Sequence, residues 1–501
     1  MVKEALFDLI KSMTMSEKRY FKIYSSKHTI GEKNEYIRLF DAISAQEKYN
    51  EDKLKDFGFV KNLAVEKNYL YRIILKSLNS FHDQSSAKNK VYGILKSVEV
   101  LFHKGLYEQA MRQVSKARRI ARDNELFAQE LVVNELEVEL LSKQFDYQAA
   151  SNRIQEAEKV SEKLTNFNRL QKVTTDCYAA RLEIGTSRSQ NDSIRLQSFL
   201  QMDGVGGKGY PLTKRAEMYR LGLHLTYAYF IGDELKTLEL TEQMTELYEG
   251  TPFLIEYSPI GYVSSLYNLH NAYKSCGKEL DADRVLIRLE QCKTKYGIPT
   301  SDNIGARVFF YSTNIRLTNY LREYNVESAG ALIMNTTKEF KRFSSKIGKP
   351  QLYEYYFLTA KWAFLSSDFR YALRQTNEIL NDLGFKVRAD LLSATRLLNL
   401  LIHYELRNDF TIEYLAKNTL SYLRKKDRLF KVEDELIRFI LNHQKVQNIQ
   451  DKVADLKQLS NELNKYKDHQ FEGRPFDYFD FHSWAENKAK SELEGTQKKE
   501  K

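Results

Sequence analysis

A glycine-rich string at residues 204–209 is the part of the sequence closest to a nucleotide-binding motif. Its residues, Gly-Val-Gly-Gly-Lys-Gly, satisfy the spacing GxGxxG. A dinucleotide site needs a strand before this string and a helix directly after it, so that backbone N–H groups meet the pyrophosphate. Here an amphipathic helical pattern at 194–202 precedes the string, and Pro211 follows it. The string also fails as a P-loop because Lys208 is followed by Gly209, so we predict a loop between helices.

The histidines and acidic residues form no recognised metal or catalytic motif. No two of the nine histidines have the HExxH spacing that places two imidazoles on one helical face. Asp480 and His482 are two residues apart and Asp477 is close, which leaves a surface triad open. An aromatic capping segment with polar edges explains the same residues. We therefore predict no metal, no cofactor and no enzymatic activity.

The cysteines and the apolar segments indicate the compartment. The three cysteines, Cys177, Cys276 and Cys292, form no CxxC pair, so the sequence contains neither a disulfide framework nor a cysteine zinc site. Residues 1–13 carry acidic side chains within an amphipathic pattern, unlike the apolar core of a signal peptide. No run of 18 apolar residues occurs. We expect a cytoplasmic protein without membrane insertion.

Helices must position the side chains of this protein, because the composition excludes an all-β fold. The 501 residues include only 6 Pro and 21 Gly, the residues that turn-dense β architectures need. Hydrophobic residues make up 42% and charged residues 29%, which indicates a folded chain. The net charge of +10 is spread unevenly but not concentrated as in a global polyanion binder. The densest basic stretch contains Lys338, Lys341, Arg342, Lys346 and Lys349.

A turn motif recurs along the chain at a nearly constant interval. Each copy combines a small or polar turn with the start of a new apolar period, and most copies have an Ala shortly afterwards. Counted from the third residue of each turn, the copies lie at 107, 147, 234, 279, 326, 369 and 410. These intervals predict a unit of about 43 residues, with a hidden unit near Gln190 and a further one near Asp451.

Four prolines support the same period. Pro211, Pro259, Pro299 and Pro350 precede four of the turns, at the place where the first helix of a pair would begin. That position tolerates the missing N–H of proline. Each unit then has room for two helices of roughly 18 residues.

Residues 267–282 resemble the tetratricopeptide repeat. Their sequence, YNLHNAYKSCGKELDA, has the Asn-Leu, the Ala-Tyr, the turn Gly and the second-helix Ala of that family in register. Residues 101–121 resemble the second half of the motif. The period exceeds the family's 34 residues, and His270 stands where the family has Gly or Ala, so we expect longer helices packed further apart. The segments 16–22 and 476–484 also look like those of uncharacterised bacterial repeat proteins.

The resemblance implies an all-α fold, a right-handed α-α superhelix of the TPR type with about 8–9 helical pairs. We expect the repeat array at 91–470. Residues 1–90 have helical patterns without the turn motif and form the predicted N-terminal helical cap domain. The aromatic residues of 471–487 predict a C-terminal capping segment that packs on the array, and 488–501 a disordered charged tail.

Arrays of this family usually bind through a concave face lined by one side of each first helix. The resemblance places on that face Tyr267, Asn271 and Lys274, then Tyr311, Asn314 and Thr318, then Phe357, Lys361 and Phe364. Amides and ammonium groups can hold a peptide backbone or a carboxylate. Chaperone-binding members use a clamp of Asn and Lys or Arg residues, to which only Asn271 and Lys361 correspond. Our candidates for groove binding are Tyr267, Asn271, Lys274, Asn314 and Lys361, and ordinary solvated groove residues are the alternative.

We therefore expect a non-enzymatic cytoplasmic scaffold or adaptor that recognises a protein or peptide segment in its groove. The alternative is a transcriptional or RNA-linked regulator with a repeat sensor domain and nucleic-acid contact through residues 1–90. Its candidate residues are Lys18, Arg19 and Lys22, which alternate with aromatic residues. A solvated cap face explains the same three cations. The partner's identity and the oligomeric state stay open.

Overall fold

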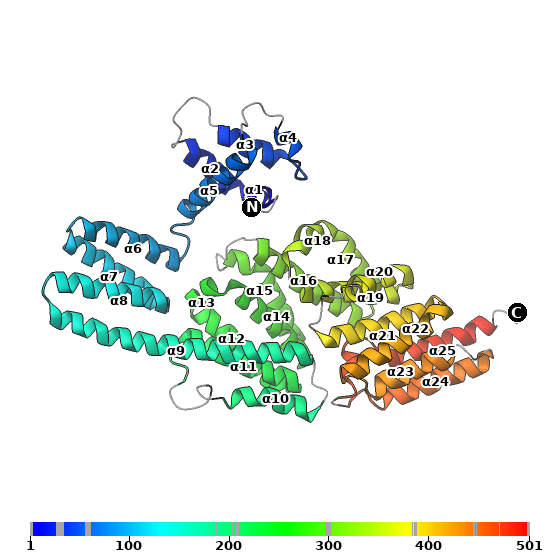
Figure 1. The fold of residues 1–501 in the computed structure, drawn as a ribbon. Helices are drawn as coiled ribbons and strands as arrows, with labels where there is room; N and C mark the ends of the chain where they lie inside the picture. Colours follow the sequence, from blue (N-terminus) through cyan, green and yellow to red (C-terminus); the bar gives the residue numbers. More distant parts are fainter. Residues whose placement is uncertain are drawn as a thin grey trace. The chain divides into compact units, whose positions relative to one another are not determined.

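The computed structural model describes most of the chain. The described residues are 4–26, 35–55, 62–185, 189–202, 205, 210–295, 302–382, 384, 388–443, 446, 448–469 and 471–497. Within them the chain forms α-helices α1 to α25 and two short 3-10 helices, and none of these residues belongs to a strand (Figure 1). The all-α prediction is confirmed. The chain folds as two compact units, Met1–Leu164 and Thr165–Lys501.

The first unit contains two separate apolar cores. Its helices are α1 (Ala5–Ser12), α2 (Met15–Ser26), α3 (Glu35–Ala45), α4 (Asp52–Lys55), α5 (Leu63–Phe81), α6 (Ala87–His103), α7 (Tyr107–Asp123), α8 (Phe127–Lys143) and the first part of α9 (Tyr147–Ile184). Helices α1 to α5 enclose one core, where the rings of Phe21 and Phe40 lie 4.5 Å apart. Helices α6 to α8 enclose the other, around Val114 and Val133. The boundary predicted at residue 90 lies near the start of α6.

Helix α9 is exceptionally long. It continues for 38 residues without Gly or Pro, the residues that most often end a helix. The border between the two units falls inside it, after Leu164. Helix α10 (Gln190–Leu200) begins where the hidden unit was predicted. The double interval in the repeat pattern therefore contains a helix start at Gln190 whose preceding residues do not match the turn motif.

Helices of the second unit pack against their neighbours along the chain. They are α11 (Lys214–Ile231), α12 (Glu234–Gly250), α13 (Pro252–Tyr257), α14 (Pro259–Ser275), α15 (Glu279–Lys295), α16 (Asp302–Arg322), α17 (Val326–Asn335), α18 (Thr337–Phe343), α19 (Lys349–Leu365), α20 (Phe369–Leu380), α21 (Ala389–Glu405), α22 (Asp409–Lys425), α23 (Lys431–His443), α24 (Ile449–Asn464) and α25 (Phe481–Gln497). Close pairs include α14 with α15, α19 with α20 and α24 with α25 (Figure 1). This packing is compatible with a helical repeat protein.

The turns between helices lie where the repeat pattern predicts them. Helices α7, α9, α12, α15, α17 and α20 begin at residues 107, 147, 234, 279, 326 and 369, as predicted, and α22 begins at 409 instead of 410. Each of these turns contains a residue with positive φ, such as Gly277 at 70° or Ser367 at 60°. A left-handed residue at a helix end lets the chain reverse, and Gly adopts this conformation most easily. Similar turns at Glu125 and Asp427 were not predicted from the sequence.

Two of the three described prolines of the repeat pattern lie at the start of a helix, as expected. Pro259 is the first residue of α14 and Pro350 is the second residue of α19. Pro211 lies three residues before α11. Pro299 lies outside the described residues. Helices α14 and α19 each have 17 residues, close to the predicted length.

The C-terminal segment differs from the sequence prediction. Helix α25 continues to Gln497, so the predicted disordered tail is helical from residue 488 to 497, and 498–501 lie outside the described residues. Tertiary contacts explain the difference, because Ala489 is buried and Lys488 Nζ donates to Glu405 Oε2 at 2.7 Å. No described helix combines the length and the apolar character that a membrane crossing requires.

Candidate functional site

The five predicted groove residues lie on three helices of the second unit. Tyr267, Asn271 and Lys274 belong to α14, Asn314 to α16 and Lys361 to α19. The structure brings the first two into one cluster with other aromatic and charged groups. Lys274, Asn314 and Lys361 lie outside this cluster.

Tyr267 joins three helices through its ring and its hydroxyl group. The ring stacks on Tyr311 of α16, with centroids 4.2 Å apart and an angle of 21° between the planes. The hydroxyl donates to Glu354 Oε1 of α19 at 3.0 Å. Burial, reinforced by the Glu354 carboxylate, raises the pKa of Tyr267, while a hydrogen bond from Asn271 opposes the rise. Tyr267 and Asn271 therefore act together in a structured polar contact between helices.

Lys274 and Asn314 differ from the expected solvated groove residues. Lys274 forms an ion pair with Glu279, across the turn between α14 and α15. Asn314 is only 2% exposed. Neither its Oδ1 nor its Nδ2 has a hydrogen-bond partner within the described part of the chain. A buried amide without partners costs free energy, so Asn314 lowers the stability of the packed helices.

Lys361 is a half-buried cation on α19. Within the described residues its ammonium group forms neither a hydrogen bond nor an ion pair. Burial, together with the positive charge of Arg322, lowers the pKa of Lys361 to about 8, while Asp480 has the opposite effect. An amine with this pKa near a negative charge can hold a carboxylate, and it loses part of its charge just above neutral pH.

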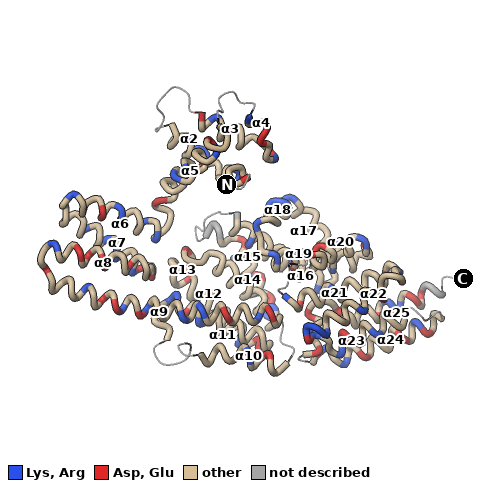
Figure 2. The backbone as a smooth tube through the Cα atoms, in the orientation of Figure 1, with Lys and Arg blue, Asp and Glu red and all other residues tan. Residues whose placement is uncertain are grey.

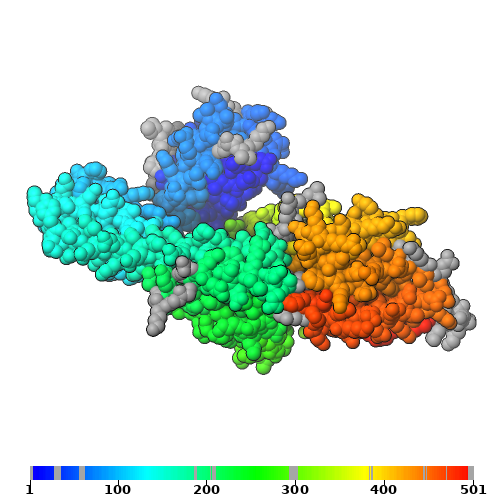
Figure 3. Space-filling model, turned by 60° about the horizontal axis from the view of Figure 1, so that its bottom comes forward, coloured from blue at the N-terminus to red at the C-terminus, as the bar shows by residue number. Residues whose placement is uncertain are grey.

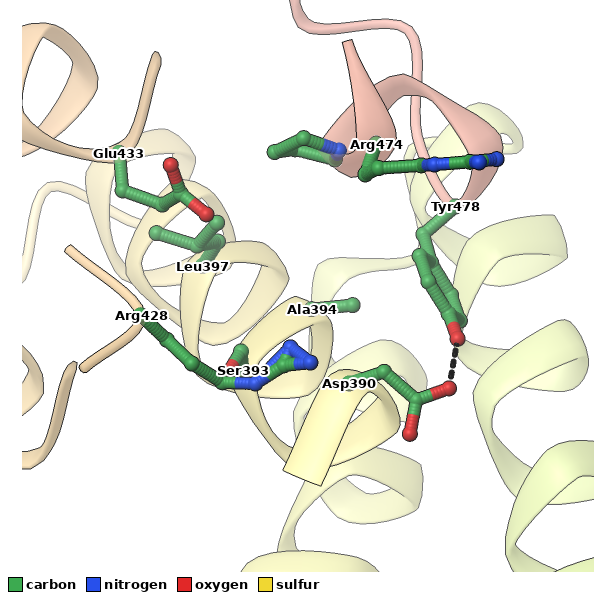
Figure 4. Close-up of a pocket in the computed structure, with 9 residues that line it drawn as sticks. Asp390, Ser393, Ala394, Leu397, Arg428, Glu433, Arg474 and Tyr478 are labelled. Carbon is green, nitrogen blue, oxygen red and sulfur yellow. Dashed lines mark hydrogen bonds between the residues drawn. The ribbon is translucent and has the colours of Figure 1, made fainter. Parts of the chain in front are cut away.

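A second group of polar residues, absent from the sequence prediction, lies at the start of α21. Arg388 Nε donates to both Asp390 oxygens, at 3.1 and 3.2 Å. The Tyr478 hydroxyl donates to Asp390 Oδ2 (Figure 4) and accepts from Arg388 Nη2 at 3.4 Å. Burial opposes the ionisation of Asp390, but Arg388 and Tyr478 hold its pKa below the ordinary value. The nearby Glu354 carboxylate helps to raise the pKa of Arg388, after Tyr478 and Asp390 and against the effect of burial.

We call these residues the inner polar cluster, which consists of Tyr267, Tyr311, Glu354, Arg388, Asp390 and Tyr478. It connects α14, α16, α19, α21 and the segment before α25. Its α14 and α16 members, Tyr267 and Tyr311, were expected on the concave face from the resemblance to the repeat family. Sequence reasoning missed Arg388 and Asp390 because no turn motif precedes α21, and it interpreted Tyr478 only as an aromatic capping residue.

A small pocket opens beside the inner polar cluster (Figure 4). Its lining residues are Asp390, Ser393, Ala394, Leu397, Arg428, Glu433, Arg474, Pro475 and Tyr478. Arg428 and Arg474 enter it from different elements, and Arg428 Nη2 also donates to the Ile184 carbonyl oxygen at 2.8 Å. Its volume of about 20 Å³ suffices for a single water molecule. The pocket is thus almost filled by the protein's own side chains.

The segment Arg474–Asp480 fills this region. The Tyr478 ring meets the Phe357 ring edge to face at 5.7 Å, and the Phe479 ring meets Phe364 at 5.2 Å. At its other end, Arg474 lies against Gly232, where an added Cβ atom would be 2.5 Å from Nη2. Figure 3 shows the red and orange C-terminal surface bordering the green surface of the same unit.

The suggested triad of Asp477, Asp480 and His482 is not assembled. Asp480 accepts hydrogen bonds from the backbone and hydroxyl of Ser483, at 3.0 and 2.8 Å. His482 Nδ1 instead lies 2.8 Å from the Ser460 hydroxyl. Asp480 therefore caps α25 and His482 contacts α24, while Asp477 lies 3.6 Å from Arg474 Nη1.

The three cations proposed for nucleic-acid contact lie on α2 in the first unit. Lys18 Nζ donates to Ser44 Oγ at 3.1 Å, and Lys22 forms an ion pair with Asp41 at 2.7 Å. Arg19 is exposed and has no partner among the described residues. Two of the three cations therefore already have a partner on α3.

The densest basic stretch lies on α18 and the residues after it (Figure 2). Lys338 and Lys341 are exposed, whereas the ring of Phe340 stacks on Tyr355 at 4.7 Å and Phe343 is buried. The cations are thus the outward side of an amphipathic helix.

Two other motifs of the sequence concern nucleotide and metal binding. Except for Val205, the residues of the string 204–209 lie outside the described residues. Within the described residues, no group of three or more His, Cys, Asp or Glu side chains is arranged to hold a metal ion. A comparison of the chain with known protein families gives no match, and a comparison with curated proteins gives none either.

Proposed function

We propose that this protein is a non-enzymatic cytoplasmic scaffold that binds a segment of a partner protein. In this proposal the helices form a right-handed solenoid of the tetratricopeptide type, and the binding face includes α14, α16 and α19. The helix starts at the predicted period support such an architecture. Function on such a fold depends on the groups of the site and not on the fold itself.

The observation that carries the proposal is the state of Lys361. Its half-buried ammonium group has lost part of its hydration, yet no acceptor within the described residues compensates for that loss. A charge in such a place is costly unless it is paired. A carboxylate of a bound segment would supply the missing partner.

The test is partner capture followed by measured affinity. Tagged full-length protein would isolate its partner from its own cytosol, and calorimetry would then measure the Kd of the purified pair. We expect Lys361→Met to weaken binding about tenfold or more, because an ionic hydrogen bond is lost. Asn271→Ala should weaken it less, because Asn271 acts beside Tyr267.

Lys417→Met is the matched control. Lys417 lies exposed on α22 in an ion pair with Glu413, so its replacement should leave the affinity unchanged. Equal weakening by both lysine substitutions would show a general charge effect and contradict the proposal. So would turnover of a small-molecule substrate that depends on Lys361.

The alternative, nucleic-acid contact through residues 1–90, has weaker support. Lys18 and Lys22 already have partners in the same unit, which leaves only Arg19 fully available. Replacing all three by Glu would remove salt-dependent binding of DNA or RNA if this alternative were correct. Unchanged affinity would eliminate it.

A further inference from the structure

Residues 476–480 alternate aromatic and acidic side chains between α24 and α25. Their sequence is Phe-Asp-Tyr-Phe-Asp, and we call them the acidic-aromatic segment. The segment also contacts helices other than the two that it joins. Its Tyr478 contacts α19 and α21, the latter 88 residues earlier in the chain. It therefore behaves like a short peptide docked onto upstream helices.

Tyr478 makes the most specific contacts of the segment. Its hydroxyl bonds to Asp390 and Arg388, and its ring packs against Phe357. The hydroxyl thus contacts a charged pair, while the ring contacts an aromatic side chain. A phenylalanine would keep the ring contact and lose the hydrogen bonds, so the site discriminates tyrosine from phenylalanine.

The acids of the segment meet basic groups but do not satisfy all of them. Asp477 lies 3.6 Å from Arg474 Nη1, and Arg322 also attracts its charge. Asp480 is turned toward Ser483, where it caps α25, and toward Lys467 at 3.6 Å. Because of this orientation Asp480 does not pair with Lys361. Lys361 therefore feels the charge of Asp480 but has neither a hydrogen bond nor an ion pair with it, and on the described residues it can still pair with another carboxylate.

We infer that the partner of this protein presents a tyrosine between acidic residues, and that the acidic-aromatic segment is an internal copy of that sequence which the partner displaces. This inference rests on the proposed function and names the class of segment that it binds. An external segment would repeat the contacts to Arg388 and Asp390. In addition, it could place a carboxylate on Lys361, which the tethered segment cannot reach while Asp480 caps α25.

The test uses a labelled peptide of residues 474–481, RPFDYFDF, and fluorescence anisotropy with the full chain. Wild type and Tyr478→Phe are compared, because the substitution weakens the resident segment without emptying its ring site. Loss of a hydrogen bond to a charged group should raise the peptide's apparent affinity about 10- to 100-fold in the variant. Hydrogen exchange of residues 474–480 should become faster when the peptide binds.

Two controls make the result specific. A peptide with Phe in place of the central Tyr should bind the variant at least tenfold more weakly than the original peptide, and a scrambled peptide should not bind. Asp477→Asn is a second weakening variant, because it removes the attraction between Asp477 and Arg322 of α16. The Asp477 side chain is 57% exposed, so this variant preserves folding if Tyr478→Phe does not. It should raise peptide affinity by a smaller factor.

Two outcomes would overturn the inference. The first is absence of peptide binding to wild type and both variants. The second is equal affinity of the captured partner for wild type and Tyr478→Phe. In the second case the proposed function stands if Lys361→Met still weakens partner binding, and only the identity of the segment is wrong.

Discussion

The lysines of α2 and the lysine of α19 differ in whether a neighbouring helix supplies an acceptor for the ammonium group. Lys18 and Lys22 lie on a solvated surface, and each has an acceptor on α3. Lys361 lies among aromatic helices and has no acceptor in the described part of the chain. An exposed ion pair contributes little free energy, whereas a buried charge without a partner is expensive. The comparison shows that a binding function is better sought where polar groups are buried and unsatisfied than where they are numerous.

The largest effect is expected at the inner polar cluster. Asp390→Ala removes the carboxylate that pairs with Arg388 and Tyr478, and should lower the free energy of unfolding by about 3 to 5 kcal/mol. Urea unfolding followed by circular dichroism measures this change. Glu413→Ala, which breaks an exposed pair with Lys417, should cost less than about 0.5 kcal/mol. Similar costs for both would show that the cluster does not stabilise the fold.

The same substitution makes a prediction about pH. Burial works against the charge of Asp390, but Arg388 and Tyr478 place its folded pKa below the unfolded value. Such a carboxyl stabilises the protein above its unfolded pKa, and the contribution disappears as pH falls through the folded pKa. The difference between wild type and Asp390→Ala should therefore shrink in acid, below about pH 4. A constant difference over this range would contradict the assigned interactions.

Lys361→Met should have an intermediate effect of the opposite sign. The folded pKa of about 8 lies below the unfolded value, so the charged lysine destabilises the fold at neutral pH. Its replacement should raise the free energy of unfolding by about 2 kcal/mol at pH 7. The unfolded chain binds more protons between pH 8 and about 10.4, so wild type gains stability there and the difference shrinks. The control Lys417→Met should show no such pH dependence.

A matched pair of buried asparagines gives a smaller effect. Asn314 has no partner for either amide atom within the described residues, whereas Asn399 Nδ2 donates to Thr376 Oγ1 at 2.9 Å. Asn314→Leu should stabilise the protein by about 1 to 2 kcal/mol, because it removes an unsatisfied amide. Asn399→Leu should destabilise it, because it leaves a buried hydroxyl with one partner fewer. Thermal unfolding of both variants measures the contrast, and destabilisation by Asn314→Leu would indicate an unseen partner.

The smallest effect is expected on α2. Lys22→Ala removes an ion pair with Asp41 whose two side chains are 45% and 50% exposed, and should change the free energy of unfolding by less than about 1 kcal/mol. High salt should abolish even this difference. A larger loss measured by urea unfolding would mean that this surface is as tightly organised as the inner polar cluster.

The features that could be predicted depend on residues that are close together in the sequence. The starts of α12, α15 and α20 were found from turn residues, because a helix ends where a left-handed residue interrupts its hydrogen bonds. The resemblance to the repeat family placed Tyr267 and Tyr311 on a concave binding face, and only the structure shows that their rings stack on each other. Turns at Glu125 and Asp427 were not predicted because they lie between successive copies of the recurring turn motif, where the sequence carries no such motif. The length of α9 was not predicted, because the repeat pattern indicates where a turn is present and gives no sign where a turn is missing.

By itself the sequence determined the helical class, the period of the recurring turns and the first residues of the helices that follow those turns, because these depend on side chains a few positions apart. Only the tertiary structure decided which polar groups have partners. The contact of Tyr478 with Asp390 spans 88 residues, and no local pattern encodes it. The burial of Asn314 and the lowered pKa of Lys361 likewise result from helices that pack around them. Desolvation is a property of the packed interior, so the site emerges only when the helices are assembled.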